Sequence, residues 1–330
     1  MPMESLAVMI SPVVLFLLGF IIGVLTGFFG VGGGFLVTPA LNIFGLPMVQ
    51  AIGTGFFVIM GNTFIGAIRH RRLGNIDLKL GTILGLCSVG GVELGKRLVF
   101  HLEKLHLVGT YVRVTYIILL ALISMWMLRE YYHHWKRQRD EGPGEDIESR
   151  ESMDTVARHL YRIELPPSIS LPRSAVGEAS IWVLVVSGLL IGFLSGFMGI
   201  GGGLIGLPLL IYVIGMPTII AVGTSLVTVF LTSTYGTAVY ALAGSVQWMA
   251  GLIILAGAII GVHCGVYATE YVTGMKIKIL FGLLLFVVAG SVFLKQINME
   301  TTSTYLVVGS ACVLSLVILL PLGKNIWARH

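Results

Sequence analysis

The chain has 330 residues, of which 56% are hydrophobic and only 11% are charged. Soluble domains carry about 25% charged residues, so this composition excludes an ordinary soluble globular protein, a disordered chain and a collagen-like repeat. The 43 glycines far exceed the usual share of about 7%, and apolar chains rich in glycine are typical of packed transmembrane helices.

Charged side chains are missing from long blocks of the sequence. Residues 1–68 contain one, Glu4, and residues 179–269 contain none. Since one helix crosses a bilayer with about 20 apolar residues, each block can hold several spans. The sequence predicts an all-α, polytopic transmembrane helical bundle. The predicted spans cover residues 6–29, 48–68, 78–99, 107–128, 180–198, 218–243, 248–269, 279–294 and 305–322.

Two shorter apolar segments, residues 35–44 and 204–214, each follow a run of glycines. About ten helical residues extend only about 15–17 Å, which is half of a bilayer core. We therefore expect broken or half helices at these two places, which either cross the membrane or re-enter it.

Residues 129–177 differ from the rest of the chain. They contain 8 of the 21 basic and 9 of the 16 acidic residues, which predicts a cytoplasmic loop or small subdomain. The spacing of Met153, Val156, Leu160 and Ile163 indicates a short amphipathic helix within it.

An internal repeat relates the two apolar parts of the chain. Residues 27–34 read GFFGVGGG and residues 196–203 read GFMGIGGG, at an offset of 169. One residue later in register, at an offset of 170, AIGT at residues 51–54 matches AVGT at residues 221–224. The repeat divides the chain into a first membrane half (1–128), the charged loop (129–177), a second membrane half (178–298) and an additional C-terminal helix (299–330).

The placement of Lys and Arg bears on topology. Arg69, Arg71 and Arg72 and the loop at residues 129–177 are the most basic segments, so both are expected in the cytoplasm. If each half helix counts as a crossing, each half crosses the membrane an odd number of times, and the two halves are inverted relative to each other. If the half helices only re-enter, the halves are parallel. The remaining Lys and Arg residues favour the inverted arrangement.

The glycine runs are the strongest candidates for a binding site. They lack the preceding strand and following Lys-Ser/Thr of a phosphate loop, which leaves close helix packing through small residues or a helix break that lines a cavity. A break followed by a half helix presents unpaired N–H groups, and breaks at corresponding places in two halves indicate a transporter site. The candidate residues are Gly32, Gly33, Gly34, Gly201, Gly202 and Gly203.

No charged residue lies near either glycine run in sequence. A metal or organic cation would require carboxylates, whereas backbone N–H groups and hydroxyls could hold a small anion; unwound carbonyls could also bind Na⁺. The side chains that could contribute are Thr54, Asn62, Thr224, Ser225, Thr228 and Thr232. The alternative is that these groups bond to their own helix or join neighbouring helices.

Glu93 and His263 match each other at an offset of 170 and lie inside predicted spans, so a proton-coupling role is conceivable. However, Lys96 and Arg97 follow Glu93 by three and four residues, which favours a local ion pair. The sequence therefore does not decide whether transport is coupled to protons or to another ion.

Other chemistries find no support in the sequence. It contains no HExxH or GxSxG motif and no paired acids in one apolar span, so no catalytic residue, metal or cofactor is expected. Cys87, Cys264 and Cys312 lie in apolar runs without CxxC spacing. The net charge of +5 fits cytoplasmic loops and is no evidence for nucleic-acid binding.

The order G-x-x-G-x-G-G-G, proline, A-[IV]-G-T, twice in one chain, resembles the sulfite exporter TauE/SafE family of membrane permeases. The resemblance covers about residues 19–97 and 188–270. It implies a multi-pass secondary carrier in the cytoplasmic membrane of a prokaryote, for sulfur-containing anions such as sulfite, sulfonates or sulfoacetate. The resemblance also implies that the glycine motifs, Thr54 and Thr224 belong to the central site. Gly55 stands where the second half has Ser225, so the two half-sites differ chemically.

We expect a secondary transporter, in the exporting direction, that works by alternating access on a small anion. A passive channel for small solutes is the first alternative, and a membrane scaffold that presents residues 129–177 to a partner is the second. The sequence does not indicate an oligomeric state.

Overall fold

The computed structural model describes residues 11–141, 167–171, 177–272 and 274–327. Within these ranges, nine helices are long and apolar enough to cross a membrane. They are α2 (Pro12–Phe29), α4 (Met48–Arg72), α5 (Leu78–Lys104), α6 (Val108–Glu141), α9 (Ile181–Met198), α11 (Thr218–Leu242), α12 (Trp248–Ala268), α13 (Gly274–Gln296) and α14 (Glu300–Trp327). The prediction of an all-α membrane bundle is confirmed, and the protein is a multi-pass membrane protein.

The two half helices are present where the sequence predicts them. The first is α3 (Gly34–Ile43), and the second consists of α10 (Gly203–Pro208) and a π-helical turn, η1 (Leu209–Val213). Each contains a proline, which cannot donate to the preceding turn and clashes with it. In the second half, the helix widens into the π turn directly after Pro208.

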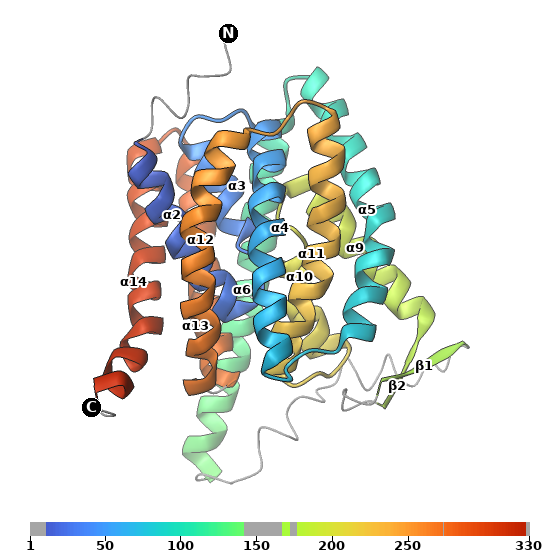
Figure 1. The fold of residues 1–330 in the computed structure, drawn as a ribbon, viewed down its shortest axis with the longest axis vertical. Coiled ribbons are helices and arrows are strands. Elements are labelled where there is room, and N and C mark those ends of the chain that lie inside the picture. Colours follow the sequence, from blue (N-terminus) through green and yellow to red (C-terminus); the bar gives the residue numbers. More distant parts are fainter. Residues whose placement is uncertain (1–10, 142–166, 172–176, 273, 328–330) are drawn as a thin grey trace.

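Helix α2 packs along α12, and its counterpart α9 packs along α5 (Figure 1). A Cβ atom built at Gly23 would lie 2.2 Å from the carbonyl oxygen of Ala258, and one at Gly192 would lie 1.9 Å from that of Ser88. Such distances leave no room for a side chain. Glycine is therefore required in these two pairs because their backbones touch, as small residues allow in membrane bundles.

Helices α4 and α11 match in sequence and pack against each other in the middle of the bundle. Phe56, early in α4, meets Gly236, late in α11, whereas Gly66 meets Leu226. The two helices therefore run antiparallel. Helices α6 and α13 do the same, since Arg113 bonds Gln296 at one end of the pair and Glu130 bonds Lys278 at the other.

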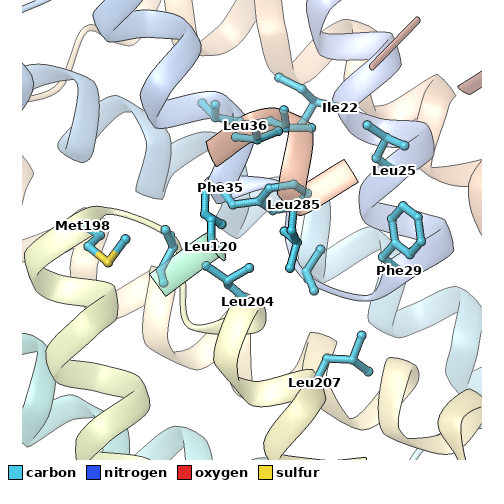
Figure 2. Packing of buried hydrophobic residues seen from close by; sticks show 14 of the residues in the cluster. Ile22, Leu25, Phe29, Phe35, Leu36, Leu120, Met198, Leu204, Leu207 and Leu285 are labelled. Atoms are coloured by element: carbon cyan, nitrogen blue, oxygen red, sulfur yellow. The ribbon is translucent and has the colours of Figure 1, made fainter. Parts of the chain in front are cut away.

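The short helices are embedded in hydrocarbon side chains (Figure 2). Phe35 and Leu36 of α3 lie among residues of α2, while Leu204 and Leu207 extend from α10 toward the same cluster. The ring of Phe281 on α13 lies 5.9 Å from that of Phe35. Because lipid tails are as apolar as these side chains, such contacts stabilise the bundle through close packing more than through removal of water.

The charged segment between the halves is partly described. Helix α6 continues to Glu141, beyond the predicted end of its span, and a short antiparallel hairpin joins β1 (Ser168–Leu171) to β2 (Gly177–Ser180). The hairpin lies at the same end of the bundle as the end of α6 (Figure 1). The amphipathic helix predicted around Leu160 lies outside the described residues. A short 3₁₀ turn, η2 (Thr269–Tyr271), follows α12.

Candidate functional site

Both glycine runs break the helix in the same way. Helix α2 ends at a left-handed residue, and two more left-handed residues precede α3; the second half repeats this with α9 and α10. Such backbone conformations favour glycine because it has no Cβ atom. The φ values are +70°, +74° and +76° at Gly30, Gly32 and Gly33, and +72°, +70° and +89° at Gly199, Gly201 and Gly202. The predicted helix breaks are thus present.

The two breaks contact each other inside the bundle. A Cβ atom at Gly34 would lie 2.6 Å from the carbonyl oxygen of Ile200, and one at Gly203 would lie 2.4 Å from that of Val31. Each half helix therefore begins against the break of the other half. These contacts join residues that lie 166 and 172 positions apart in the sequence.

The point where the breaks meet is closed by two apolar side chains. Ile59 of α4 and Val229 of α11 are equivalent at the offset of 170, and both are fully buried. Cβ atoms built at Gly32 and at Gly201 would each contact both side chains. The centre of the bundle is therefore blocked by hydrocarbon.

Backbone N–H groups without hydrogen-bond partners lie around this centre. Within the described residues, no backbone hydrogen bond is formed by the N–H groups of the glycines predicted as a site, Gly32, Gly33, Gly34, Gly201, Gly202 and Gly203. These groups belong to the breaks or to the first turn of a helix, where N–H groups have no intrahelical partner and the helix dipole is positive. The arrangement suits a negatively charged or strongly accepting group.

Three buried hydroxyls near the breaks also lack partners among the described residues: Thr26, Ser195 and Ser225. A Cβ atom at Gly33 would lie 2.5 Å from Oγ1 of Thr26, and one at Gly206 would lie 3.4 Å from Oγ of Ser225. Buried hydroxyls are normally hydrogen-bonded. Thr26 and Ser195 were not predicted as site residues, although they match at the offset of 169, directly before the glycine motifs.

The half-sites differ at one position. Gly55 stands where the second half has Ser225, and Thr38 of α3 fills the space beside it, since a Cβ atom at Gly55 would lie 2.6 Å from Oγ1 of Thr38. That hydroxyl donates to the carbonyl oxygen of Gly199 over 2.9 Å. The first half thus has the hydrogen-bonded hydroxyl of Thr38 beside Gly55, whereas the second half has the unpartnered hydroxyl of Ser225.

Thr54 of α4 and Thr224 of α11 form hydrogen bonds to the starts of neighbouring helices. Oγ1 of Thr224 accepts the N–H of Asp77 over 3.0 Å, and Oγ1 of Thr54 accepts the N–H of Gln247 over 2.9 Å. Asp77 and Gln247 are the N-caps of α5 and α12. Each threonine therefore joins a central helix to the start of a helix from the other half of the chain.

Thr228 and Thr232 continue the same face of α11, and this face lies against α5. Thr228 donates to the carbonyl oxygen of Gly81 over 3.1 Å, and the hydroxyls of Thr232 and Ser88 lie 2.6 Å apart. Asn62, the counterpart of Thr232, is fully buried, and neither atom of its amide has a hydrogen-bond partner among the described residues. Asn62 therefore keeps free donors and acceptors.

The two ionisable candidates have local partners. Glu93 pairs with Lys96 at 2.8 Å and with Arg97 at 3.1 Å, as the spacing indicates. Nδ1 of His263 lies 2.8 Å from the carbonyl oxygen of Ile259 in its own helix. His70 was not among the predicted residues. It is fully buried beside the motif, with Nε2 lying 3.2 Å from the carbonyl oxygen of Gly27.

Comparison with known proteins identifies the family of the chain. The sequence profile of the family described as sulfite exporter TauE/SafE matches residues 15–292. A probable membrane transporter protein of Methanocaldococcus jannaschii is 29% identical over 202 residues, which cover 59% of this chain and 60% of that protein. The probable membrane transporter protein YunE of Bacillus subtilis is 26% identical over 264 residues, or 77% and 87% of the two chains.

A probable membrane transporter protein of Xylella fastidiosa is 28% identical over 275 residues, which cover 82% of this chain and 90% of that protein. No solved structure matches the chain. The family profile spans both membrane halves and both glycine breaks. The chain is therefore a membrane transporter that belongs to the sulfite exporter TauE/SafE family.

Proposed function

We propose that the protein is a secondary transporter that exports small sulfur-containing anions such as sulfite, sulfonates or sulfoacetate. The observation that carries this proposal is the pair of glycine breaks, which meet inside the bundle with unpaired N–H groups. The family supplies the class of sulfur anion, since it is described as a family of sulfite exporters.

The chemistry of the breaks favours an anion over a cation. Residues 179–269, which include the whole second break, contain no Asp or Glu to balance a cation. N–H groups at a helix start instead stabilise negative charge without a formal positive charge. We propose that the glycine N–H groups and Ser225 contact the anion directly, together with Asn62, Thr26 and Ser195.

The remaining predicted residues have a supporting part in this proposal. Thr54, Thr224, Thr228 and Thr232 hold α4 and α11 in place against the neighbouring helices. Their hydroxyls would set the position of the central helices on which Ser225 and Asn62 lie. Glu93 and His263 remain candidates for proton coupling that act from the outer surface of α5 and α12.

We infer that the two halves form an inverted-topology repeat. The antiparallel course of the equivalent helices α4 and α11 supports this arrangement, as does the start of each half helix against the break of the other half. Inverted repeats are a common basis of alternating access. In this mechanism Ile59 and Val229 close the centre, and the movement of one half against the other exposes the anion to each side in turn.

We propose that the chain consists of four parts. These are a first membrane half (1–128), a cytoplasmic segment (129–177), a second membrane half (178–298) and an additional C-terminal helix (299–330). The end of α4 with Arg69, Arg71 and Arg72 and the charged segment are placed in the cytoplasm because basic loops stay on that side. Export then starts from the side of the charged segment.

The test is sulfite uptake by proteoliposomes that contain the purified full-length protein. We expect Gly33→Ala and Gly202→Ala to lower the rate at least about tenfold, because both glycines have left-handed backbone and an added methyl group displaces the groups beside the site. The matched control is Gly309→Ala, since nothing lies within 4 Å of a Cβ atom at that position. Normal uptake by both break variants would overturn the site.

A further inference from the structure

His70 is a buried ionisable residue next to the first glycine motif. It lies in the last turn of α4, where Arg69, Arg71 and Arg72 are exposed but the side chain of His70 is fully buried. Its Nε2 atom lies 3.2 Å from the carbonyl oxygen of Gly27. Because a carbonyl oxygen only accepts hydrogen bonds, this contact assigns a proton to Nε2, which is the donor.

The other nitrogen of the ring is not used in any contact of the described residues. Nδ1 of His70 is buried there without a hydrogen-bond partner. In the neutral ring with its proton on Nε2, Nδ1 carries a lone pair. Buried polar atoms are normally hydrogen-bonded, so an unpartnered basic nitrogen at this depth calls for an explanation. Nδ1 is the atom that can accept a second proton.

Two helix ends favour a positive charge at this place. Gly27 belongs to the last turn of α2, which ends at Phe29, and His70 belongs to the last turn of α4. Carbonyl groups in the last turn of a helix have no intrahelical partner, and they give that end a partial negative charge. A protonated imidazole at His70 is therefore stabilised by both helices.

No described carboxylate contacts His70. Helix α2 and residues 218–226 at the start of α11 contain no ionisable side chain. In the loop after α4, the carboxylate of Asp77 accepts a backbone N–H of α5 over 3.0 Å, and on α13 Lys278 pairs with Glu130. The ionisable side chains in the last two turns of α12 are those of His263, Cys264 and Tyr267. A second proton on His70 thus adds a positive charge without a described ion pair.

The second half makes the same contact without a basic group. Tyr240 is equivalent to His70 at the offset of 170, and its hydroxyl donates to the carbonyl oxygen of Gly196 over 2.8 Å. A tyrosine hydroxyl stays protonated over the physiological range, whereas an imidazole gains and loses a proton there. The contact with the first glycine of the motif therefore does not require a histidine. Only the first half adds a group that can bind a proton.

We propose that His70 binds, at Nδ1, a proton that is transported together with the anion. Gly27 begins the motif whose last three glycines form the first half of the proposed anion site, so both ligands bind to the same break. Opposite charges attract strongly in a protein interior, and each ligand then raises the affinity for the other. The inference rests on the proposed anion transport and names its coupling ion. Glu93 and His263 are weaker candidates because their side chains have local partners.

The experiment measures the accumulation of labelled sulfite in proteoliposomes that contain the purified full-length protein, with the membrane potential held at zero. The outside is either at the internal pH or one pH unit more acidic. If one proton accompanies each anion, the acid outside raises the accumulation by wild type about tenfold, because one pH unit is a tenfold ratio of proton activity. Wild-type protein that shows normal counterflow and no response to the gradient overturns the proposal.

The decisive variant is His70→Tyr, which copies the second half: it keeps a donor for Gly27 and cannot take up the proton. We expect sulfite counterflow without a gradient to persist and the tenfold response to disappear. His70→Gln, whose amide can also donate, serves if the tyrosine does not fit. Sulfite itself binds protons equally in every sample, so a difference between variants belongs to the protein. A response of wild-type size in either variant overturns the proposal.

His101→Gln is the matched control, because His101 is an exposed histidine in the last turn of α5. It should keep the full response to the gradient. His263→Gln and Glu270→Gln test the other ionisable residues near the end of α12 in the sequence. Loss of the response in one of them, with a normal response in His70→Tyr, would place the proton site elsewhere. Absence of counterflow in wild type would instead contradict the proposed anion transport, and the inference with it.

Discussion

His70 and Tyr240 occupy equivalent positions in the two halves, and each contacts the carbonyl oxygen of the first glycine in the motif of its own half. Nε2 of His70 lies 3.2 Å from the oxygen of Gly27, and the hydroxyl of Tyr240 donates to the oxygen of Gly196 over 2.8 Å. Two chemically different side chains thus fix the ends of α2 and α9 just before the helices break. Both are fully buried.

We expect Tyr240→Phe to lower the free energy of unfolding by about 1–3 kcal/mol, since the buried carbonyl of Gly196 loses its partner. The measurement is the apparent Tm of the detergent-solubilised protein. Tyr235→Phe is the control, because the Tyr235 hydroxyl bonds Glu93 near the surface over 3.3 Å. Equal Tm values for wild type and Tyr240→Phe would show that this bond does not hold the break.

Ser225→Ala should impair transport without a loss of stability. Its hydroxyl is buried and has no hydrogen-bond partner among the described residues. Its removal therefore breaks no bond within the protein and deletes the donor that we propose for the anion. We expect kcat/KM for sulfite to fall about tenfold, as for the loss of one hydrogen bond to a charged group.

The control for Ser225 is Ser233→Ala, which removes a hydroxyl that already bonds Val229 in its own helix over 2.6 Å. Transport by Ser233→Ala should match that of wild type. A Ser225→Ala variant with wild-type kcat/KM would place the anion elsewhere.

Thr54→Val and Thr224→Val test whether these threonines hold helices or bind the anion. Each change leaves a backbone N–H without its acceptor, at Gln247 or Asp77, and should cost about 1–3 kcal/mol of stability. We expect a lower apparent Tm and an unchanged KM for sulfite. A raised KM with normal Tm would instead indicate direct contact with the substrate.

Gly192→Val should prevent assembly of the bundle. A Cβ atom there would lie 1.9 Å from the carbonyl oxygen of Ser88, so α9 and α5 would have to separate, at a cost of about 3 kcal/mol or more. The fraction of monodisperse protein in size-exclusion chromatography measures this effect. Gly309→Val, in open space on α14, should elute like wild type.

Local patterns in the sequence were enough to predict the helices and the breaks. Runs of apolar residues define the spans, and the repeated glycines with short apolar segments predict α3 and α10 to within a residue or two of their observed starts. These features depend on residues close together in the chain. The same is true of the ion pairs of Glu93, which follow from the spacing along one helix turn.

The identity of each neighbour could not be predicted in the same way. Helical periodicity places Thr224, Thr228 and Thr232 on one face, but it does not show that this face meets α5 instead of the breaks. The contact of buried His70 on α4 with the carbonyl oxygen of Gly27 on α2 likewise depends on the tertiary packing, which brings these two helices together. Thr26 could have been predicted from the internal repeat, since the hydroxyl residue Ser195 stands at the matching position.

The measurement that tests carrier function most directly is sulfite counterflow in proteoliposomes that contain the wild-type protein. An alternating-access carrier exchanges one bound anion for another. Uptake of labelled sulfite should therefore saturate and should accelerate when the vesicles are loaded with unlabelled sulfite. Uptake that rises linearly with concentration and ignores internal sulfite would contradict the carrier and indicate a channel, and no uptake of any sulfur anion would contradict the proposed function.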